Sequence, residues 1–312
     1  NNNNCSLCGS KNLIEFSNFG KVALAGSFLK EKNFNIEKKY VLRMGFCKLC
    51  LGVQIIDHID PNILFKNYFY SSSNIQTLND HFINLANEIN DDFIIDKIND
   101  VVIEFGCNDG VLLRPLNKLG IKNIIGIDPA KNIVAKINIS GVNIINDYFN
   151  KKTTKEILNK FGKIKVILAN NVFAHISEIR ESASCVSSLL SDDGVFIFEV
   201  HYLGKIIEEL QYDFIYHEHL YYHSLTSLTN FLSSNNLMIF DVKFIDIHAG
   251  SIRVYTSKKN IDYPKKISKN VKRLLHAENQ KNYHKVETFK RLNSDIKKHN
   301  EELIMLLKKL KS

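Results

Sequence analysis

Several features that would place the chain in a special class of protein are missing from the sequence. It has no tryptophan and only four prolines among 312 residues. It also lacks a run of about 18 apolar residues, the length needed for a membrane-spanning helix. The first residues, Asn-Asn-Asn-Asn-Cys, carry neither a basic flank nor an apolar core, so a secretory signal is not expected. These absences predict a cytoplasmic chain with no membrane partner.

Composition and charge exclude further classes. Apolar residues make up 45% and charged residues 24%, which argues against disorder and against a disulfide-stapled miniprotein. The net charge of +8 is uneven, because residues 258–312 hold 16 Lys and Arg against 6 Asp and Glu. The rest of the chain is therefore slightly acidic. Since a basic groove on the globular part is not indicated, we expect no nucleic-acid partner.

Short apolar stretches in the middle of the chain predict one sheet. Helical stretches separate most of them, and their nearly unbroken apolar character suits parallel strands covered on both faces. Residues 237–244 and 251–257 are expected to add edge strands. The fold class is therefore α/β, a Rossmann-like doubly wound sheet. The five central strands are expected at 100–105, 123–127, 142–146, 165–169 and 195–200.

Four of the six cysteines predict a structural Zn²⁺ site. Cys5 and Cys8 form one C-x-x-C pair and Cys47 and Cys50 form another, with 38 residues between the pairs. Two such pairs can surround one zinc ion tetrahedrally, and four protein ligands leave no open position for catalysis. Disulfides are disfavoured in a cytosolic chain. An iron–sulfur cluster and unbound or redox-active cysteines remain alternatives.

A glycine-rich turn, residues 106–110 (GCNDG), follows the first predicted strand of the sheet. A strand, a short glycine-rich turn and a helix form the first crossover of a nucleotide-binding fold. Gly106 allows a tight turn, and the following helix offers N–H groups to an anion. Because Asn108 stands two residues after Gly106, the dinucleotide pattern G-x-G-x-x-G is absent and a hydride cofactor is disfavoured.

Polar residues follow the neighbouring strands. Asp128, 18 residues after Gly110, can accept hydrogen bonds from both ribose hydroxyls of a nucleotide. Asp147 follows the third strand, where either an adenine contact or a surface loop is expected, and Asn170 follows the fourth. Together with Glu104 in the first strand, this pattern resembles the motifs of Rossmann-like methyltransferases that use S-adenosyl-L-methionine (SAM). An α/β domain with an unrelated turn is the alternative.

Residues 216–223 (YHEHLYYH) contain three His, three Tyr and one Glu. On a strand His217 and His219 would share a face, whereas on a helix His219 and His223 would. We favour an acid–base cluster, because histidine titrates near neutral pH, a carboxylate can orient it and tyrosines can donate to an oxyanion. A metal site and a purely structural cluster are the alternatives.

The basic tail has an amphipathic pattern. Its apolar residues recur mostly at three- or four-residue steps between 267 and 307, which predicts a long helix with one apolar stripe. That stripe needs something to pack against. The chain is thus divided into a zinc-binding domain (1–75), a methyltransferase domain (76–257) and a basic helical tail (258–312).

Three segments carry a resemblance to one family. Residues 169–176 (ANNVFAHI), 212–225 (YDFIYHEHLYYHSL) and 248–255 (HAGSIRVY) are similar to bacterial sugar C-methyltransferases. These enzymes methylate a carbon of a nucleotide-linked 3-keto-deoxysugar. The C-x-x-C pairs and residues 68–72 match the zinc-binding domain of that family. The resemblance therefore implies SAM as cofactor and a nucleotide-sugar as substrate.

The resemblance also implies residue roles. His219 would remove the proton from the carbon beside the ketone, and Tyr216 or Tyr70 would hydrogen-bond the enolate oxygen. Glu218 would orient His219. The substrate cleft would hold Tyr70, His175, Tyr216, Glu218 and His219. SAM would contact Glu104, Gly106, Asn108, Asp128 and Asn170, and the turn and the third strand add Gly110 and Asp147 as candidates.

The chain departs from the family in two places. Ala249 stands where the family usually has glycine, and family members normally continue into a further domain, so the chain is expected to lack the C-terminal domain. The tail helix would then pack on that missing domain or on a second subunit. A small-molecule O- or N-methyltransferase, a zinc-ribbon nucleic-acid binder and an inactive scaffold are the other functions considered.

Overall fold

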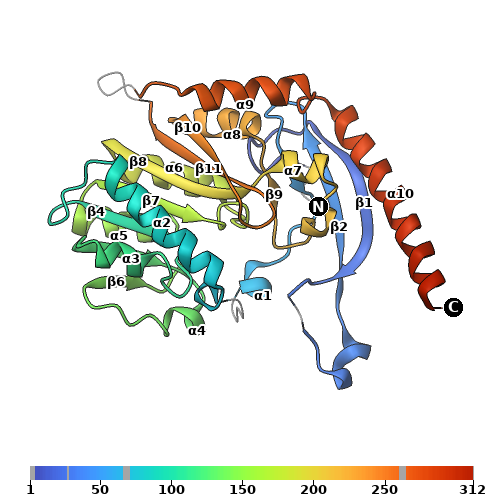
Figure 1. Cartoon of the computed structure of the whole chain (residues 1–312), viewed down its shortest axis with the longest axis horizontal. Coiled ribbons are helices and arrows are strands. Elements are labelled where there is room, and N and C mark those ends of the chain that lie inside the picture. The colour runs from blue at the N-terminus through green and yellow to red at the C-terminus, as the bar shows by residue number, and fades with distance from the viewer. Residues whose placement is uncertain (1–3, 27, 66–70, 260–264, 312) are drawn as a thin grey trace. The chain divides into compact units, whose positions relative to one another are not determined.

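The computed structural model describes residues 4–26, 28–65, 71–259 and 265–311, which form two compact units. Unit 1 comprises Asn1–His58, His201–Phe231 and Lys272–Ser312, and unit 2 comprises Ile59–Val200 and Leu232–Val271. The units alternate along the chain (Figure 1). They therefore differ from the three consecutive zones into which the sequence was divided.

Unit 2 is built on a seven-stranded sheet of order β10-β11-β8-β7-β4-β5-β6. Strands β4 to β8 pair in parallel, and β10 and β11 pair antiparallel. All seven predicted strands are confirmed, but of the two expected edge strands only β10 lies at an edge, because β11 lies between β10 and β8. Their bounds are Val101–Phe105 (β4), Asn123–Ile127 (β5), Val142–Ile145 (β6), Ile164–Asn170 (β7), Leu190–His201 (β8), Leu237–Ile245 (β10) and Ser251–Lys258 (β11).

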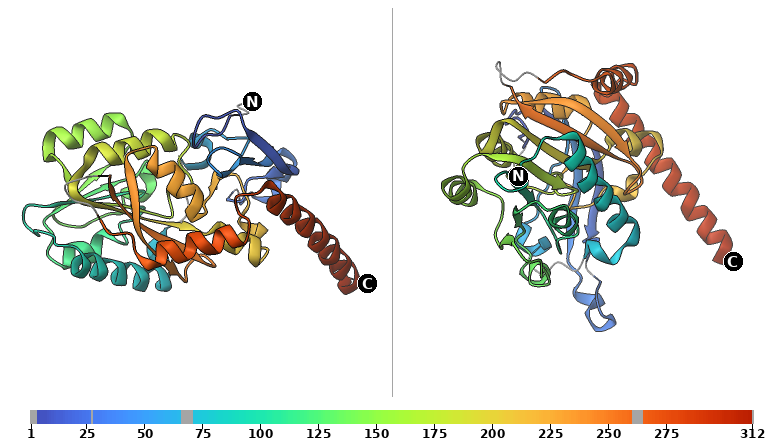
Figure 2. Two further views of the ribbon diagram at one scale, coloured as in Figure 1. Left: turned by 90° about the horizontal axis from the view of Figure 1, so that it is seen from above. Right: turned by 60° about the vertical axis from the view of Figure 1, so that its left-hand side comes forward.

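Helices cover both faces of this sheet. In the left view of Figure 2, α2 lies on one side, and α5 and α6 lie on the other. Helix α2 presents Leu78, Phe82 and Leu85 to the core, where they join Val102 and Leu168 of the central strands. The helices are α1 (Pro61–Phe65), α2 (Gln76–Asp92), α3 (Leu113–Lys118), α4 (Lys131–Val134), α5 (Lys151–Phe161) and α6 (Ile179–Leu189).

Unit 1 contains a four-stranded antiparallel sheet of order β1-β2-β3-β9. Its strands are β1 (Leu13–Ala23), β2 (Lys39–Cys47), β3 (Val53–Ile55) and β9 (Tyr221–Tyr222). Strand β9 comes from the histidine-rich segment, and Tyr222 pairs with Val53. The sheet shares a core with the C-terminal helix, because Phe46 stacks on Phe289 at 4.9 Å between ring centroids. Helices α7 (Leu203–Glu208) and α8 (Leu225–Ser233) flank β9 in sequence.

The tail forms two helices, α9 (Lys269–Gln280) and α10 (Val286–Lys311). Helix α10 is the expected long C-terminal helix, but it begins later than the apolar pattern predicted. Asn282 adopts a left-handed φ of 60°. Its N–H bonds to the Asn279 carbonyl and the Tyr283 N–H bonds to the Glu278 carbonyl, the arrangement that terminates a helix. Among the described residues, none of the helices is both long and apolar enough to cross a bilayer.

Candidate active site

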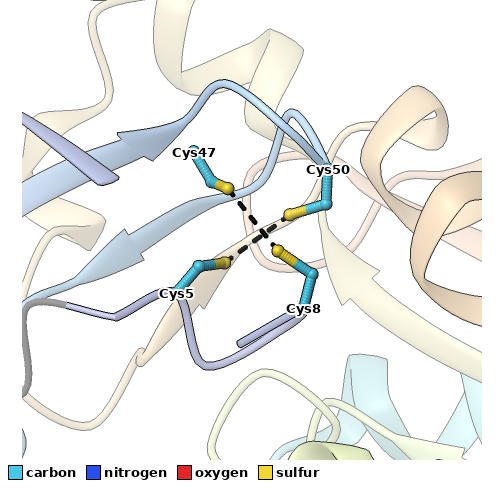
Figure 3. A group of neighbouring side chains, drawn as sticks. All are labelled: Cys5, Cys8, Cys47 and Cys50. Atoms are coloured by element: carbon cyan, nitrogen blue, oxygen red, sulfur yellow. Dashed lines mark hydrogen bonds between the residues drawn. The ribbon is translucent and has the colours of Figure 1, made fainter. Parts of the chain in front are cut away.

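Four cysteine sulfurs converge in unit 1 (Figure 3). The sulfurs of Cys5, Cys8, Cys47 and Cys50 lie within 4.8 Å of one another, and the Cys5–Cys50 and Cys8–Cys47 pairs are each 3.6 Å apart. A tetrahedral zinc ion with Zn–S bonds of about 2.3 Å requires sulfurs roughly 3.8 Å apart. The Cys50 thiol lowers the pKa of Cys5 to about 6, which favours the thiolate that binds metal. The cluster is a four-cysteine zinc-binding site.

The turns around these cysteines explain their convergence. Gly9 adopts a φ of 77°, and its N–H bonds to the Cys5 carbonyl at 2.7 Å. The Leu51 N–H closes the second turn on the Cys47 carbonyl at 2.9 Å. A Cβ atom at Gly52 would lie 2.3 Å from the end of the Leu7 side chain, so a larger residue there would displace Leu7. Both C-x-x-C pairs thus sit on tight turns that aim two sulfurs the same way.

The glycine-rich turn of unit 2 lies at the carboxyl end of β4. Gly106 has a φ of 70°, and a Cβ atom there would lie 2.6 Å from Val172. Gly110 has a φ of 78° and Asn108 a φ of 50°. The N–H groups of Gly106 and Cys107 donate to the carbonyl of Ile127, the last residue of β5. The turn therefore folds back over the carboxyl edge of the sheet. Because Gly106 has no side chain, the backbone of the turn can lie close to Val172.

Asp128 supports this turn. It is buried, and its carboxylate accepts hydrogen bonds from the N–H groups of Asn108 at 3.0 Å and Ala130 at 2.9 Å. Burial raises the pKa of Asp128. Each carboxylate oxygen can accept further bonds, so the residue is able to hold ribose hydroxyls while it fixes the loop.

Glu104 and Asn170 form a buried polar pair beside the turn. The Asn170 side-chain amide donates to Glu104 Oε1 at 3.1 Å. Among the described residues, Glu104 Oε2 and Asn170 Oδ1 have no hydrogen-bond partner. Burial is the main reason that the pKa of Glu104 rises to about 8, and nearby carboxylates add to it. Two buried acceptors without donors indicate a ligand with N–H groups.

A third buried carboxylate, Asp109, was not among the residues singled out from the sequence. Its Oδ2 accepts hydrogen bonds from the hydroxyl groups of Ser71 and Ser73, which tie residues 71–73 to the glycine-rich turn. Within the part of the chain described, Glu104, Asp109 and Asp128 make no ion pair. Three buried acids without a cationic partner suit a positively charged ligand. SAM carries an ammonium and a sulfonium group, so these residues fit it.

The other candidate site residues of unit 2 follow β6 and β7 at the carboxyl edge of the sheet. Asp147 follows β6, is partly exposed and pairs with Lys152 at 3.1 Å. His175 lies in the turn after β7, where its ring meets that of Phe65 edge-on at 6.0 Å between centroids. Tyr70 lies outside the described residues.

The histidine-rich segment of unit 1 fixes the ring of His219. His219 Nδ1 lies 2.9 Å from the Phe214 carbonyl oxygen, and Nε2 lies 2.8 Å from the Tyr216 hydroxyl. Because a carbonyl only accepts, Nδ1 must carry the hydrogen, and Nε2 of the neutral ring accepts from the Tyr216 hydroxyl. Residues 216–218 form a turn rather than the strand or helix considered from the sequence.

The other polar residues of the segment have different surroundings. His217 and His223 are buried, and burial lowers the pKa of His217 and lowers that of His223 to about 3. Burial raises the pKa of Glu218, and among the described residues its carboxylate makes no hydrogen bond. The group that orients His219 is thus the Phe214 carbonyl. Neutral, buried His217 and His223 suit a structural role.

The fold and the SAM-compatible edge place the chain in the Rossmann-like class of SAM-dependent methyltransferases. It belongs to the methyltransferase domain family, whose match covers residues 73–241. Residues 5–65 match a zinc binding domain, and residues 246–312 match the C-methyltransferase C-terminal domain. The expectation that the chain lacks the C-terminal domain is therefore wrong. It failed because the match to that domain begins at residue 246, within the stretches that the sequence analysis assigned to the methyltransferase domain and the basic tail.

Two named methyltransferases are similar in sequence to this chain. C-methyltransferase NovU of Streptomyces niveus is 33% identical over 264 residues, which cover 83% of this chain and 61% of that protein. A ubiquinone biosynthesis O-methyltransferase of Bartonella tribocorum is 29% identical over 153 residues, covering 45% of this chain and 61% of that protein. The chain thus spans less than two thirds of either relative's length.

Solved structures show similar elements at low identity. Magnesium protoporphyrin IX methyltransferase (ChlM) from Synechocystis PCC 6803, solved with bound SAH, is 15% identical, with a TM-score of 0.45. The match covers 58% of this chain and 83% of that chain.

Proposed function

We propose that the protein transfers a methyl group from SAM to a carbon next to a ketone in a nucleotide-linked deoxysugar. The match of residues 246–312 to the C-methyltransferase C-terminal domain supports transfer to carbon. The relationship to C-methyltransferase NovU supports the same chemistry. The sugar substrate is suggested by the similarity of residues 212–225 and 248–255 to sugar C-methyltransferases.

The hydrogen-bonded pair of Tyr216 and His219 carries the proposal. Carbon is a poor nucleophile, so methylation beside a ketone requires a base and a donor for the enolate oxygen. The Phe214 carbonyl holds the hydrogen of His219 on Nδ1 and leaves the Nε2 lone pair as proton acceptor. In the structure this lone pair accepts the hydrogen bond of the Tyr216 hydroxyl at 2.8 Å. A bound substrate would replace that bond, with its acidic C–H facing Nε2 and its ketone oxygen accepting from the Tyr216 hydroxyl.

Each residue then has a stated role. His219 Nε2 accepts the proton from the carbon beside the ketone, and the Tyr216 hydroxyl donates to the enolate oxygen. Glu218, whose pKa burial raises, is a second proton carrier in the same turn. His175 and Tyr70 are proposed as further substrate contacts.

Unit 2 holds the methyl donor in this proposal. SAM supplies an electrophilic methyl group on its sulfonium. Asp128 would accept from the ribose hydroxyls, and Glu104 and Asn170 would accept from the ammonium group. Gly106, Asn108 and Gly110 would let the backbone approach the cofactor, and Asp147 would meet the adenine.

The test is a matched pair of substitutions at His219. In His219→Asn the side-chain amide can still donate to the Phe214 carbonyl, but the Nε2 lone pair is lost. We expect turnover of a thymidine-diphosphate-linked 3-keto-deoxysugar to fall by about 100-fold or more, while calorimetry gives unchanged SAM affinity. Tyr216→Phe should lower turnover less. Unchanged turnover in His219→Asn would remove His219 from the role of base.

An O-methyltransferase acting on a small molecule is the second candidate. The similarity to a ubiquinone biosynthesis O-methyltransferase over 153 residues favours it, and His219 would equally accept a hydroxyl proton. The product separates the two functions, because a methyl group on carbon gives a C–CH₃ signal in NMR that differs from that of an O–CH₃ group. A methoxy signal would replace the first proposal with the second.

A further inference from the structure

The Phe214 carbonyl that orients His219 belongs to a single 3₁₀ turn, Tyr212–Phe214. Within this turn the Phe214 N–H donates to the Gln211 carbonyl at 3.3 Å, and the Ile215 N–H follows by donating to the Tyr212 carbonyl at 2.9 Å. Hydrogen-bond geometry is poorer in a 3₁₀ turn than in an α-helix. The position of the Phe214 carbonyl therefore depends on what the Phe214 side chain packs against.

The ring of His201 packs on the ring of Phe214. His201 is the last residue of β8, and the two ring centroids lie 4.1 Å apart with the planes tilted by 35°. The His219 ring is nearly parallel to the Phe214 ring, at 6.4 Å between centroids and 8° between planes. Ring contacts of this kind favour particular geometries. They restrict the Phe214 side chain, and with it the backbone that carries the carbonyl.

Gln211 fixes the plane of the His201 ring. His201 Nε2 lies 2.9 Å from Gln211 Oε1, and Gln211 Nε2 donates to the Glu209 carboxylate at 2.8 Å. Because the amide nitrogen faces the carboxylate, the amide oxygen faces His201 and accepts a hydrogen from its Nε2. That hydrogen is present on a ring of this tautomer whether the ring is neutral or protonated. The contact therefore does not require a charge on His201.

A second donor also reaches the Phe214 carbonyl. The Tyr222 hydroxyl of β9 lies 3.5 Å from this oxygen, whereas His219 Nδ1 lies 2.9 Å from it. The longer contact is the weaker one, and a carbonyl oxygen has two lone pairs and can accept both. His219 Nδ1 is thus the main donor, and the carbonyl determines which ring nitrogen of His219 carries the hydrogen.

We propose that His201, held by Gln211, is a positioning residue for His219. Its ring packs on Phe214 and keeps the Phe214 carbonyl within reach of His219 Nδ1, so that the lone pair of the neutral ring stays on Nε2. This inference rests on the proposed role of His219 as the base. His201 and Gln211 both lie outside the segments whose similarity to sugar C-methyltransferases indicated the other site residues.

The position of the hydrogen on His219 is the first measurement. Nitrogen-15 NMR of protein with labelled histidine distinguishes a ring nitrogen that carries a hydrogen from one that carries a lone pair, and His219→Asn assigns the signal. In the wild-type chain without substrate we expect the hydrogen on Nδ1. In His201→Ala the neutral ring should populate both tautomers, because the acceptor for Nδ1–H is no longer held in place. A wild-type tautomer in His201→Ala would overturn the proposal.

Turnover is the second measurement. His201→Ala should lower kcat about 10-fold or more, while KM for a keto-sugar nucleotide and SAM affinity in calorimetry stay within about threefold of wild type. His201→Phe keeps a ring against Phe214, and Gln211→Leu keeps the imidazole without its hydrogen bond. Each should therefore lower kcat less than His201→Ala does, and these two variants serve as the test if His201→Ala does not fold. Wild-type kcat in His201→Ala, or in the other two if it does not fold, contradicts the proposal.

His299→Phe is the matched control. His299 of α10 is exposed and contacts the same 3₁₀ turn through Tyr212, whose hydroxyl lies 3.0 Å from His299 Nδ1. Its kcat and its His219 tautomer should match wild type. An equal loss of kcat in His299→Phe and His201→Ala would show that any contact to the turn has the same effect, and would refute the role of His201. A wild type with its hydrogen on Nδ1 that methylates no keto-sugar nucleotide would overturn the proposed function, while the NMR comparison would still decide the role of His201.

Discussion

The carboxylate of Glu278 in α9 accepts a 2.7 Å hydrogen bond from the backbone N–H of Leu225, the first residue of α8. It also accepts from the Thr226 N–H at 2.8 Å and from the Tyr202 hydroxyl at 3.0 Å. Glu278 is buried, and a carboxylate at a helix N-terminus satisfies N–H groups that have no partner within the helix. Unit 1 thus uses a residue of its C-terminal segment to hold the helix that follows the histidine-rich turn.

We therefore expect Glu278→Ala to destabilise the protein strongly. The buried N–H groups of Leu225 and Thr226 would lose their acceptor, at a cost of about 2–4 kcal/mol. Urea unfolding followed by circular dichroism measures this change. Glu287→Ala, at an exposed position in α10, is the control and should change stability by less than about 0.5 kcal/mol. Similar values for the two variants would show that the Glu278 cap contributes little.

Metal removal provides a second test. We expect about one zinc ion per chain, because four thiolates form one closed tetrahedral site. Chelation, or Cys47→Ser, should lower the melting temperature and expose unit 1 to protease, since zinc binding and folding are coupled in such sites. Cys185→Ser, outside the cluster, should retain the metal. Metal analysis that finds no zinc in freshly purified protein would contradict the assignment.

Asp128→Ala tests the proposed ribose contact. The substitution removes both the acceptor for the ribose hydroxyls and the acceptor for the Asn108 N–H. We expect SAM affinity in calorimetry to fall by about 10-fold or more. Asp193→Ala removes a surface carboxylate that pairs with Lys165 and should leave affinity unchanged. If both variants bind SAM like wild type, the ribose contact is refuted.

The buried carboxyl group of Glu104 predicts a pH dependence of stability. Its pKa is about 8 in the folded protein and 4.5 in its ordinary state, so between these values the folded state binds more protons than the unfolded state. Stability without ligand should therefore fall as the pH rises from about 4.5 to 8. Glu104→Gln should flatten this slope in thermal melts. A slope identical to that of wild type would show that Glu104 is ionised throughout.

The sheet of unit 2 was predictable because its signal is local. Strands such as β5 and β7 are buried on both faces, so each reads as an unbroken apolar run followed by a polar residue at the carboxyl edge. Asp128 and Asn170 stood out in the sequence for the same reason, and their contact with SAM is a prediction. The zinc site was equally predictable from the sequence, because each C-x-x-C pair places two ligands on one short turn.

Other features depend on residues far apart in the sequence. His81 of α2 and Arg253 of β11 both contact Glu199 of β8, although more than 170 positions separate them in the sequence. The Phe214 carbonyl that orients His219 is a backbone atom, so residue types could not reveal it. Asn282 ends α9 through a left-handed conformation that does not interrupt the apolar pattern.

The composition of unit 1 has a consequence for how the protein is made. Its core joins Phe16 and Phe46 to Phe289 and Leu292, so β1 and β2 cannot complete the burial of their apolar side chains until α10, more than 230 residues later, has been synthesised. Unit 2 can complete its sheet earlier. Metal binding needs only residues 5–50, so it can hold the two cysteine turns together before α10 is present.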